Sequence, residues 1–215
     1  MSDEQIESFL ARYVPKVGKW LTLSFAQSQD GKIAEAGKKP VRISGDESMM
    51  LTHQPVVLDN ELLTPLSSRL LQNLANAKGS APLLLAAIPN HAGDLSEWHR
   101  RRELLIHAGA EVCLIEADEN GNLTWSAICA KLRDLQLDSV MVEGGATVID
   151  SILRANTKQP GIIQCAIVTI SPKAIGPQGI GYETELPLQR GEGSGLVFDA
   201  EIQLGPDRVA ALRGI

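Results

Sequence analysis

Residues Val140–Leu153, which read VMVEGGATVIDSIL, organise the predicted fold of this chain. The three apolar residues at 140–142 predict a short buried strand. Gly144 and Gly145 end that strand, and the residues after them predict a helix because apolar side chains recur at helical spacing. The helical stripe consists of Ala146, Ile149, Ile152 and Leu153. The stretch therefore predicts a strand, a diglycine turn and a helix in immediate succession.

Such a turn presents bare backbone N–H groups at the start of a helix. The first N–H groups of a helix lack partners and the helix dipole is positive there, so this end attracts anions. Glycine also lets a ligand approach without a Cβ in the way. The stretch has neither the Walker spacing nor a full GxGxxG motif. The residues alone leave two interpretations open, a phosphate-binding turn and an ordinary tight connection.

Composition limits the class of protein. The chain has 215 residues, which suits one domain or one domain with a small extension, and a hydrophobic content of 44% that allows a sizeable core. The net charge of −6 argues against nucleic acid as a partner. Three widely spaced cysteines predict no disulfide framework and no metal site, which fits the reducing cytoplasm. The apolar run at 20–25 is too short to cross a membrane.

Strands and helices alternate along most of the chain, which predicts parallel βαβ units. Predicted strands cover 20–26, 56–59, 81–88, 111–117 and 139–143, and predicted helices cover 3–15, 65–78, 96–107, 125–137 and a segment from 145. The predicted helix at 65–78 turns Leu66, Leu70, Leu71 and Leu74 inward. After Gly161 two long strands, 162–171 and 195–204, follow without a helix between them. The expected fold is α/β, a mostly parallel central sheet flanked by helices with an antiparallel C-terminal edge.

One connection is too short for this pattern. Ser44 and Glu47 form a capping box that predicts a helix from about Gly45, yet the strand at 56–59 follows Pro55 directly. Proline also biases the residue before it away from the helical region. Connections between such elements usually need several residues. Either this helix is a stub or the chain lacks material here.

Three pieces of the sequence together resemble one family. They are Leu23–Ala34 (LSFAQSQDGKIA), Ile43–Gly45 with Thr52 and His53, and Val142–Thr147 (VEGGAT). They are similar to the reductase of riboflavin biosynthesis, which also forms the C-terminal half of bacterial bifunctional deaminase-reductases. The helical leader at 1–18, ahead of a reductase domain at 19–215, is similar to the stand-alone fungal reductases.

The resemblance implies a dihydrofolate-reductase-like fold, NADPH as the hydride donor and a homodimer. The implied reaction reduces the ribosylamino side chain of 2,5-diamino-6-ribosylamino-4(3H)-pyrimidinone 5′-phosphate to a ribitylamino group. The family's nucleotide-phosphate turn matches Gly145, Ala146, Thr147, Val148 and Ile149. Glu143 matches a carboxylate that contacts the substrate, and Ala26 matches a strand position that lines the nicotinamide pocket. Pro40 and Arg42 match a substrate contact and a cofactor contact.

The chain departs from the family pattern after His53. The family continues there with a central strand, a Thr and an Asp that contact NADPH, and an Arg that holds the substrate phosphate. Here Gln54 follows at once, so a segment is expected to be absent, either omitted from this chain or truly deleted. The resemblance leaves the catalytic acid unknown. Two alternatives stay open: another dihydrofolate-reductase-like NADPH reductase, and a non-catalytic nucleotide-binding protein.

Other polar residues have simpler interpretations. Asp30 is expected to shape its Asp-Gly turn rather than take part in chemistry. Thr147 and Ser151 lie four residues apart, so they either share one phosphate or belong to the polar outer face of the helix. The histidines are not at metal-ligand spacing with any set of carboxylates, and no metal is expected.

Overall fold

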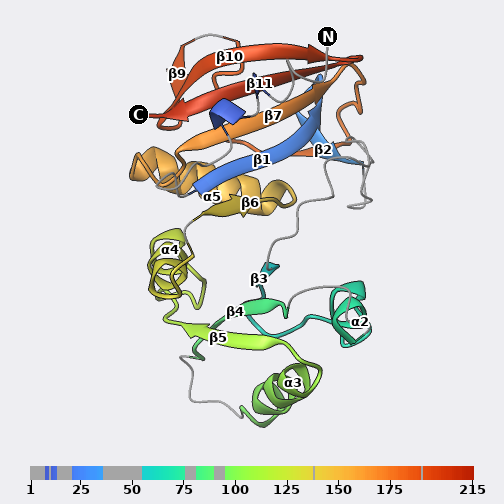
Figure 1. Cartoon of the computed structure of the whole chain (residues 1–215), viewed down its shortest axis with the longest axis vertical. Coiled ribbons are helices and arrows are strands. Elements are labelled where there is room, and N and C mark those ends of the chain that lie inside the picture. The colour runs from blue at the N-terminus through green and yellow to red at the C-terminus, as the bar shows by residue number, and fades with distance from the viewer. Residues whose placement is uncertain are drawn as a thin grey trace. The chain divides into compact units, whose positions relative to one another are not determined.

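The structure is a computed structural model that describes residues 8–9, 11–13, 21–35, 55–75, 81–89, 95–137, 139–189 and 191–215. The chain divides into two compact units. The first unit consists of residues 1–48 and 137–215, and the second consists of residues 49–136. Each unit is described by itself below, with the elements labelled in Figure 1. None of the helices in the described ranges is long and apolar enough to span a membrane.

The first unit is built on a six-stranded sheet (Figure 1). Its strands, in spatial order, are β6 (Val140–Val142), β1 (Leu21–Ser28), β7 (Cys165–Ser171), β11 (Asp207–Gly214), β10 (Leu196–Leu204) and β9 (Glu192–Gly193). β6, β1 and β7 run parallel, whereas β11, β10 and β9 add an antiparallel edge. A separate antiparallel pair joins β2 (Lys32–Ala34) to β8 (Ile180–Gly181).

The two neighbours of β1 pair with it over different lengths. Pairing with β6 ends where Leu23 meets Val142, while pairing with β7 continues as far as Ser28 and Ser171. The last part of β1, Ser24–Ser28, therefore runs on beyond the end of β6. We call these five residues the β1 extension. It lies at the carboxyl edge of the parallel strands, which is where open α/β sheets bind ligands.

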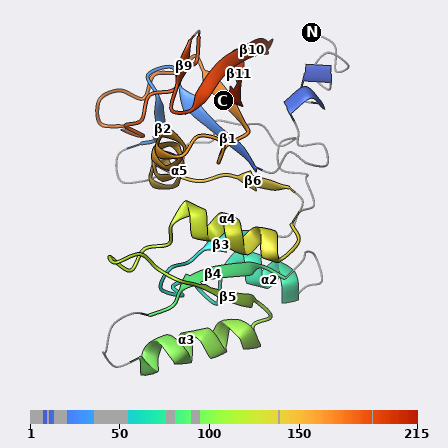
Figure 2. The same ribbon diagram turned by 90° about the vertical axis from the view of Figure 1, so that its left-hand side faces the viewer.

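Helices cover both faces of this sheet. Three residues separate β6 from α5 (Ala146–Lys158), which buries Ile149, Ile152 and Leu153 completely. The other face carries helical residues near the N-terminus, where Phe9 and Tyr13 pack with Cys165, Val209 and Ala211. Figure 2 shows α5 and this N-terminal helical segment on opposite sides of the sheet.

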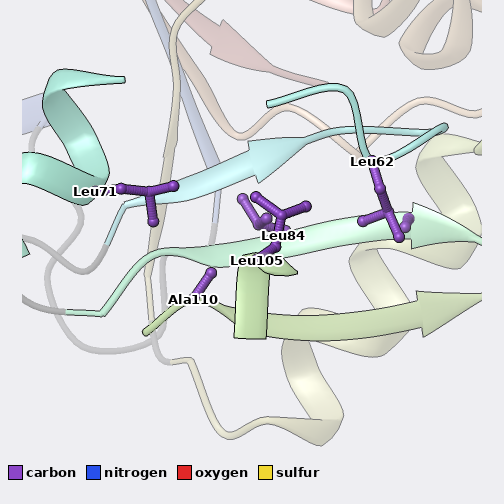
Figure 3. Packing of buried hydrophobic residues seen from close by; sticks show 6 residues of the cluster. Leu62, Leu71, Leu84, Leu105 and Ala110 are labelled. Carbon is purple, nitrogen blue, oxygen red and sulfur yellow. The ribbon is translucent and has the colours of Figure 1, made fainter. Parts of the chain in front are cut away.

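The second unit holds a three-stranded parallel sheet in the order β3 (Val56–Leu58), β4 (Leu83–Ala87) and β5 (Glu111–Ile115). Its helices are α2 (Arg69–Ala75), α3 (Ser96–His107) and α4 (Trp125–Asp134), and α3 and α4 lie on opposite sides of β5 (Figures 1 and 2). β4 is buried at every position. The core includes Leu62, Leu71, Leu84, Leu105 and Ala110 (Figure 3).

The predicted fold class is confirmed, with differences in detail. The predicted strand at 195–204 corresponds to β10, but its neighbour toward β7 is β11, a strand that the sequence analysis did not predict. The predicted helix from Pro65 begins only at Arg69, and Leu66, predicted to face inward, is 48% exposed. The side chain of Leu74, the capping box, Pro40, Arg42, His53 and Gln54 lie outside what the structure describes.

Candidate active site

The start of α5 has no side-chain cap among the described residues. Gly145 is its N-cap residue, with φ −78° and ψ 178°, and the carbonyl of Gly145 accepts the first helical hydrogen bond from Ile149 N at 3.1 Å. A Cβ built on Gly145 would meet nothing within 4 Å. The helix therefore begins beside open space, with first-turn N–H groups that no side chain of its own satisfies.

The two glycines of the turn have different roles. A Cβ on Gly144 would lie 2.8 Å from Val148 Cβ, a distance that real side chains do not tolerate. Gly144 is therefore required by the close packing of the turn against the first helical turn. Gly145 is not required by packing, and the room at Gly145 is available to a ligand.

The predicted turn residues differ in accessibility. Glu143 and Thr147 are exposed, whereas Ala146 and Val148 are half-buried. Ile149 is completely buried and its N–H is used within the helix, so this residue anchors α5 in the core. The N–H groups available for an anion are therefore those that precede Ile149.

The structure brings the turn and Ala26 to one edge of the sheet. Ala26 is half-buried on the β1 extension, three residues beyond the last pairing of β1 with β6. Glu143 follows directly after the end of β6. Parallel strands direct their carboxyl ends to the same edge of the sheet. Ala26 and Glu143 therefore both lie at the edge where the β1 extension and the turn after β6 leave the paired part of the two strands.

A loop far along the chain is fixed to α5 by Asp150, which sequence analysis did not single out. One carboxylate oxygen of Asp150 accepts hydrogen bonds from Glu183 N and Thr184 N at 3.0 Å, and from Thr184 Oγ1 at 2.9 Å. Arg154 also donates to this carboxylate. Burial opposes ionisation, but the bonds from Thr184 and Arg154 outweigh it and lower the pKa of Asp150.

Tyr182, the residue before the two that bond to Asp150, contacts the β1 extension. Tyr182 donates its phenol hydroxyl to Gln27 Oε1 at 2.6 Å. Its ring meets the ring of Phe25 edge-on, with centroids 5.5 Å apart and an interplanar angle of 83°. Burial raises the pKa of Tyr182, so the phenol stays a donor at physiological pH. No local sequence pattern marks this contact, because the two residues are 155 positions apart.

Asp30 has the structural role that the sequence predicts. Its carboxylate accepts a hydrogen bond from Ser28 Oγ at 2.6 Å and others from Ile175 N and Gly176 N. These bonds, that from Ser28 above all, lower the pKa of Asp30 to about 2. Asp30 therefore ties the turn after β1 to the loop after β7.

Two other features are less suited to a phosphate. Ser151 Oγ donates to Val148 O at 2.8 Å, so it has a partner within α5. A hollow of about 1000 Å³ includes Arg208 and Phe198 in its lining, but Arg208 is paired with Glu201 at 2.7 Å. Within the described ranges, no group of three His, Cys, Asp or Glu side chains is placed to hold a metal ion.

Comparison with known proteins places these features in a family. The family model of the RibD C-terminal domain matches residues 19–190. The 2,5-diamino-6-ribosylamino-4(3H)-pyrimidinone 5′-phosphate reductase of Candida glabrata is 24% identical over 226 aligned positions, covering 82% of this chain and 86% of the relative. The reductase of the same name from Debaryomyces hansenii is 25% identical, covering 81% and 85%.

Among solved structures, the riboflavin biosynthesis reductase of Saccharomyces cerevisiae aligns with a TM-score of 0.70 over 98% of this chain and 99% of that chain, at 18% identity. This likeness shows a shared fold. The family match covers most of the residues described above, including β1, the Glu143–Gly145 turn, α5 and the loop at 182–184. The chain therefore belongs to the RibD C-terminal domain family.

Proposed function

We propose that this chain is the NADPH-dependent reductase that converts the ribosylamino side chain of 2,5-diamino-6-ribosylamino-4(3H)-pyrimidinone 5′-phosphate to a ribitylamino group in riboflavin biosynthesis. The observation that carries the proposal is the uncapped, glycine-bordered start of α5 at the sheet edge that also holds the β1 extension. The relatives named for this reaction, from Candida glabrata and Debaryomyces hansenii, support the choice of substrate.

The residues present fit a dinucleotide. A diphosphate carries negative charge, and the start of α5 offers N–H groups that no side chain of the described residues caps, a positive dipole end and the room left by Gly145. Ala146, Thr147 and Val148 are the first-turn residues whose N–H groups would hold the diphosphate. The backbone at Ala26 would line the nicotinamide, and the exposed carboxylate of Glu143 would contact the substrate.

The reaction depends more on the positioning of the hydride donor and acceptor than on a proton donated by a protein acid. In the ring-opened imine form of the substrate, C1′ gains a hydride and the nitrogen gains a proton from solvent, which gives the ribitylamine. NADPH, when bound, supplies the hydride and leaves as NADP⁺. The protein's contribution is to hold the donor and C1′ in line and to shield them from water. We propose, from the family resemblance, that the enzyme acts in the cytoplasm as a homodimer.

The segment that is expected to be absent after His53 is the reason for a second candidate function. The alignment with the Candida glabrata reductase has more positions than this whole chain has residues, although only 82% of the chain takes part. That relative therefore has residues with no counterpart here. If they include the Arg that holds the substrate phosphate, together with the Thr and Asp that contact NADPH, the chain is left with the nucleotide contacts of the α5 turn and does not turn over the substrate.

The test is a turnover assay with the purified chain. Loss of reduced nicotinamide absorbance in the presence of the pyrimidinone phosphate, with a ribitylamino product identified by mass spectrometry, supports the proposed enzyme. Binding of NADPH without turnover identifies the nucleotide-binding alternative. Turnover of dihydrofolate in place of the pyrimidinone identifies another reductase. The intact mass of the natural gene product shows whether the segment after His53 is omitted or deleted.

A further inference from the structure

A continuous series of contacts joins the start of α5 to the β1 extension. Asp150, in the second turn of α5, holds the N–H groups of Glu183 and Thr184. Tyr182, the preceding residue, bonds to Gln27 and packs on Phe25. The loop at 182–184 therefore contacts both elements that form the candidate site, one through a carboxylate and the other through a phenol.

The contact on β1 lies on either side of the residue expected to line the nicotinamide. Phe25 and Gln27 are two positions apart in a strand, so their side chains share one face of the sheet, and Ala26 between them faces the other side. Tyr182 contacts both neighbours of Ala26, Gln27 through its hydroxyl and Phe25 through its ring. Through these contacts Tyr182 helps to fix the backbone at Ala26.

The hydrogen bond between Tyr182 and Gln27 is buried on the side of Gln27, which makes its loss costly. Gln27 is 3% exposed, so its Oε1 has little access to water as a substitute donor. The Phe25 ring packs edge-on against the ring of Tyr182, whose hydroxyl lies on the amide oxygen of Gln27. The β6 side of the β1 extension has no registered strand partner among the described residues, so the strand needs support from elsewhere.

We propose that Tyr182 is a positioning residue, which acts through Gln27 and Phe25 to fix the spacing between the diphosphate subsite on α5 and the nicotinamide subsite at Ala26. The inference rests on the proposed function. The grip on the diphosphate belongs to the turn, so Tyr182 should affect where the nicotinamide lies rather than how tightly the dinucleotide binds.

The test uses Tyr182→Phe, which keeps the ring on Phe25 and removes only the hydroxyl. We expect kcat to fall about 10-fold because the donor and acceptor carbons are misaligned. The NADPH dissociation constant, measured by fluorescence titration, should change by less than about 3-fold. A tenfold change would correspond to about 1.4 kcal/mol of binding free energy. The emission of bound NADPH should shift, and the isotope effect with 4-deuterated NADPH should rise as hydride transfer becomes slower than release.

A second variant tests the partner. Gln27→Met removes the acceptor and should reproduce the same pattern, so the test does not depend on Tyr182→Phe folding. Because both residues act through one hydrogen bond, the double variant should lose no more in kcat than either single variant. Independent, multiplying losses would overturn the proposal.

Tyr13→Phe is the matched control. Tyr13, the only other tyrosine, donates its hydroxyl to Asp199 Oδ2 at 2.6 Å, and it packs on the sheet face opposite α5. Its loss should lower the melting temperature without changing kcat, the isotope effect or NADPH emission. If Tyr182→Phe behaves like Tyr13→Phe, its role is structural and the proposal is wrong.

The outcomes separate this inference from the proposed function. Turnover by the wild type with an unchanged kcat and isotope effect in Tyr182→Phe refutes only the positioning role. If the wild type binds NADPH but turns over no pyrimidinone phosphate, the proposed function fails. In that case the emission of bound NADPH, compared between the wild type, Tyr182→Phe and Tyr13→Phe, decides the positioning role alone.

Discussion

α4 and α5 each follow a parallel strand, but they begin differently. α4 is capped by Thr124, whose backbone is extended (φ −92°, ψ 147°) and whose hydroxyl accepts from Ala127 N at 3.3 Å. α5 begins at Gly145 with similarly extended backbone but without a side chain to close the end. The two connections have the same form but different helix starts. Where a hydroxyl caps the helix, a backbone donor is used for stability, and where glycine stands, no described side chain takes up the donors, which is why we propose a ligand there.

The largest effect is expected when α5 is given a cap of its own. In Gly145→Asp, the extended backbone and the open space accommodate the side chain, and the carboxylate is suited to bond the first-turn N–H groups. It also repels a diphosphate. We expect NADPH affinity to fall about 100-fold or more, while stability stays equal or rises by a few tenths of a kcal/mol. Isothermal titration and urea unfolding measure the two effects, and wild-type affinity would contradict the assigned role of the turn.

The two glycines should separate packing from binding. Gly144→Ala forces a Cβ to within 2.8 Å of Val148 Cβ, so we expect a loss of about 1–3 kcal/mol in unfolding free energy. In Gly145→Ala the new methyl group meets no atom within 4 Å, so the expected loss is only that of replacing a glycine N-cap by alanine, about 0.5 kcal/mol. Urea unfolding of both variants makes the measurement. Equal losses of unfolding free energy at the two positions would show that the space beside Gly145 is not open.

The capped helix provides the converse test. Thr124→Ala removes the hydroxyl that accepts from Ala127 N, and we expect a loss of about 1 kcal/mol in the stability of the second unit. Unfolding followed by tryptophan fluorescence detects this loss, since Trp125 is the first residue of α4. NADPH affinity should not change. A marked fall in affinity would contradict the assignment of the ligand to the start of α5.

The smallest effect concerns pH. The pKa of Asp30 is lowered from 3.8 to about 2 in the folded protein. The carboxylate therefore contributes stability that is fully present above the unfolded pKa and is lost as the pH falls through the folded value. The melting temperature of Asp30→Asn should vary less with pH between about 4 and 2 than that of the wild type. Identical pH profiles would show that Asp30 does not tie the two loops together.

The local parts of the fold were predictable because their signals are local. The predicted helix at 96–107 and α3 have the same bounds, and the strand–diglycine–helix succession is β6, the Glu143–Gly145 turn and α5. The helix predicted from Pro65 starts late, since its first residues form a turn in which Pro65 O bonds Ser68 N. The sequence did not predict β11, which lies between β7 and β10. This strand is specified by its pairing with those two strands rather than by a local pattern.

The candidate site divides in the same way. The turn at Glu143–Ile149 could be predicted from spacing and resemblance, and its glycines lie where those arguments put them. Tyr182, Gln27 and Asp150 could not, because each acts through a side-chain contact between distant segments. No periodicity or motif encodes such a pair. The binding roles of Glu143, Ala26 and the turn residues stay predictions, as do those of Pro40 and Arg42.

The most direct measurement is a titration of the ¹⁵N-labelled chain with NADP⁺, followed by the backbone amide resonances. We expect the largest shifts on Gly145–Val148, with slower amide exchange there in the complex, and no response from the amides at the start of α4. Unchanged resonances at Gly145–Val148, with the largest shifts on another element, would contradict the claim that the open start of α5 holds the dinucleotide.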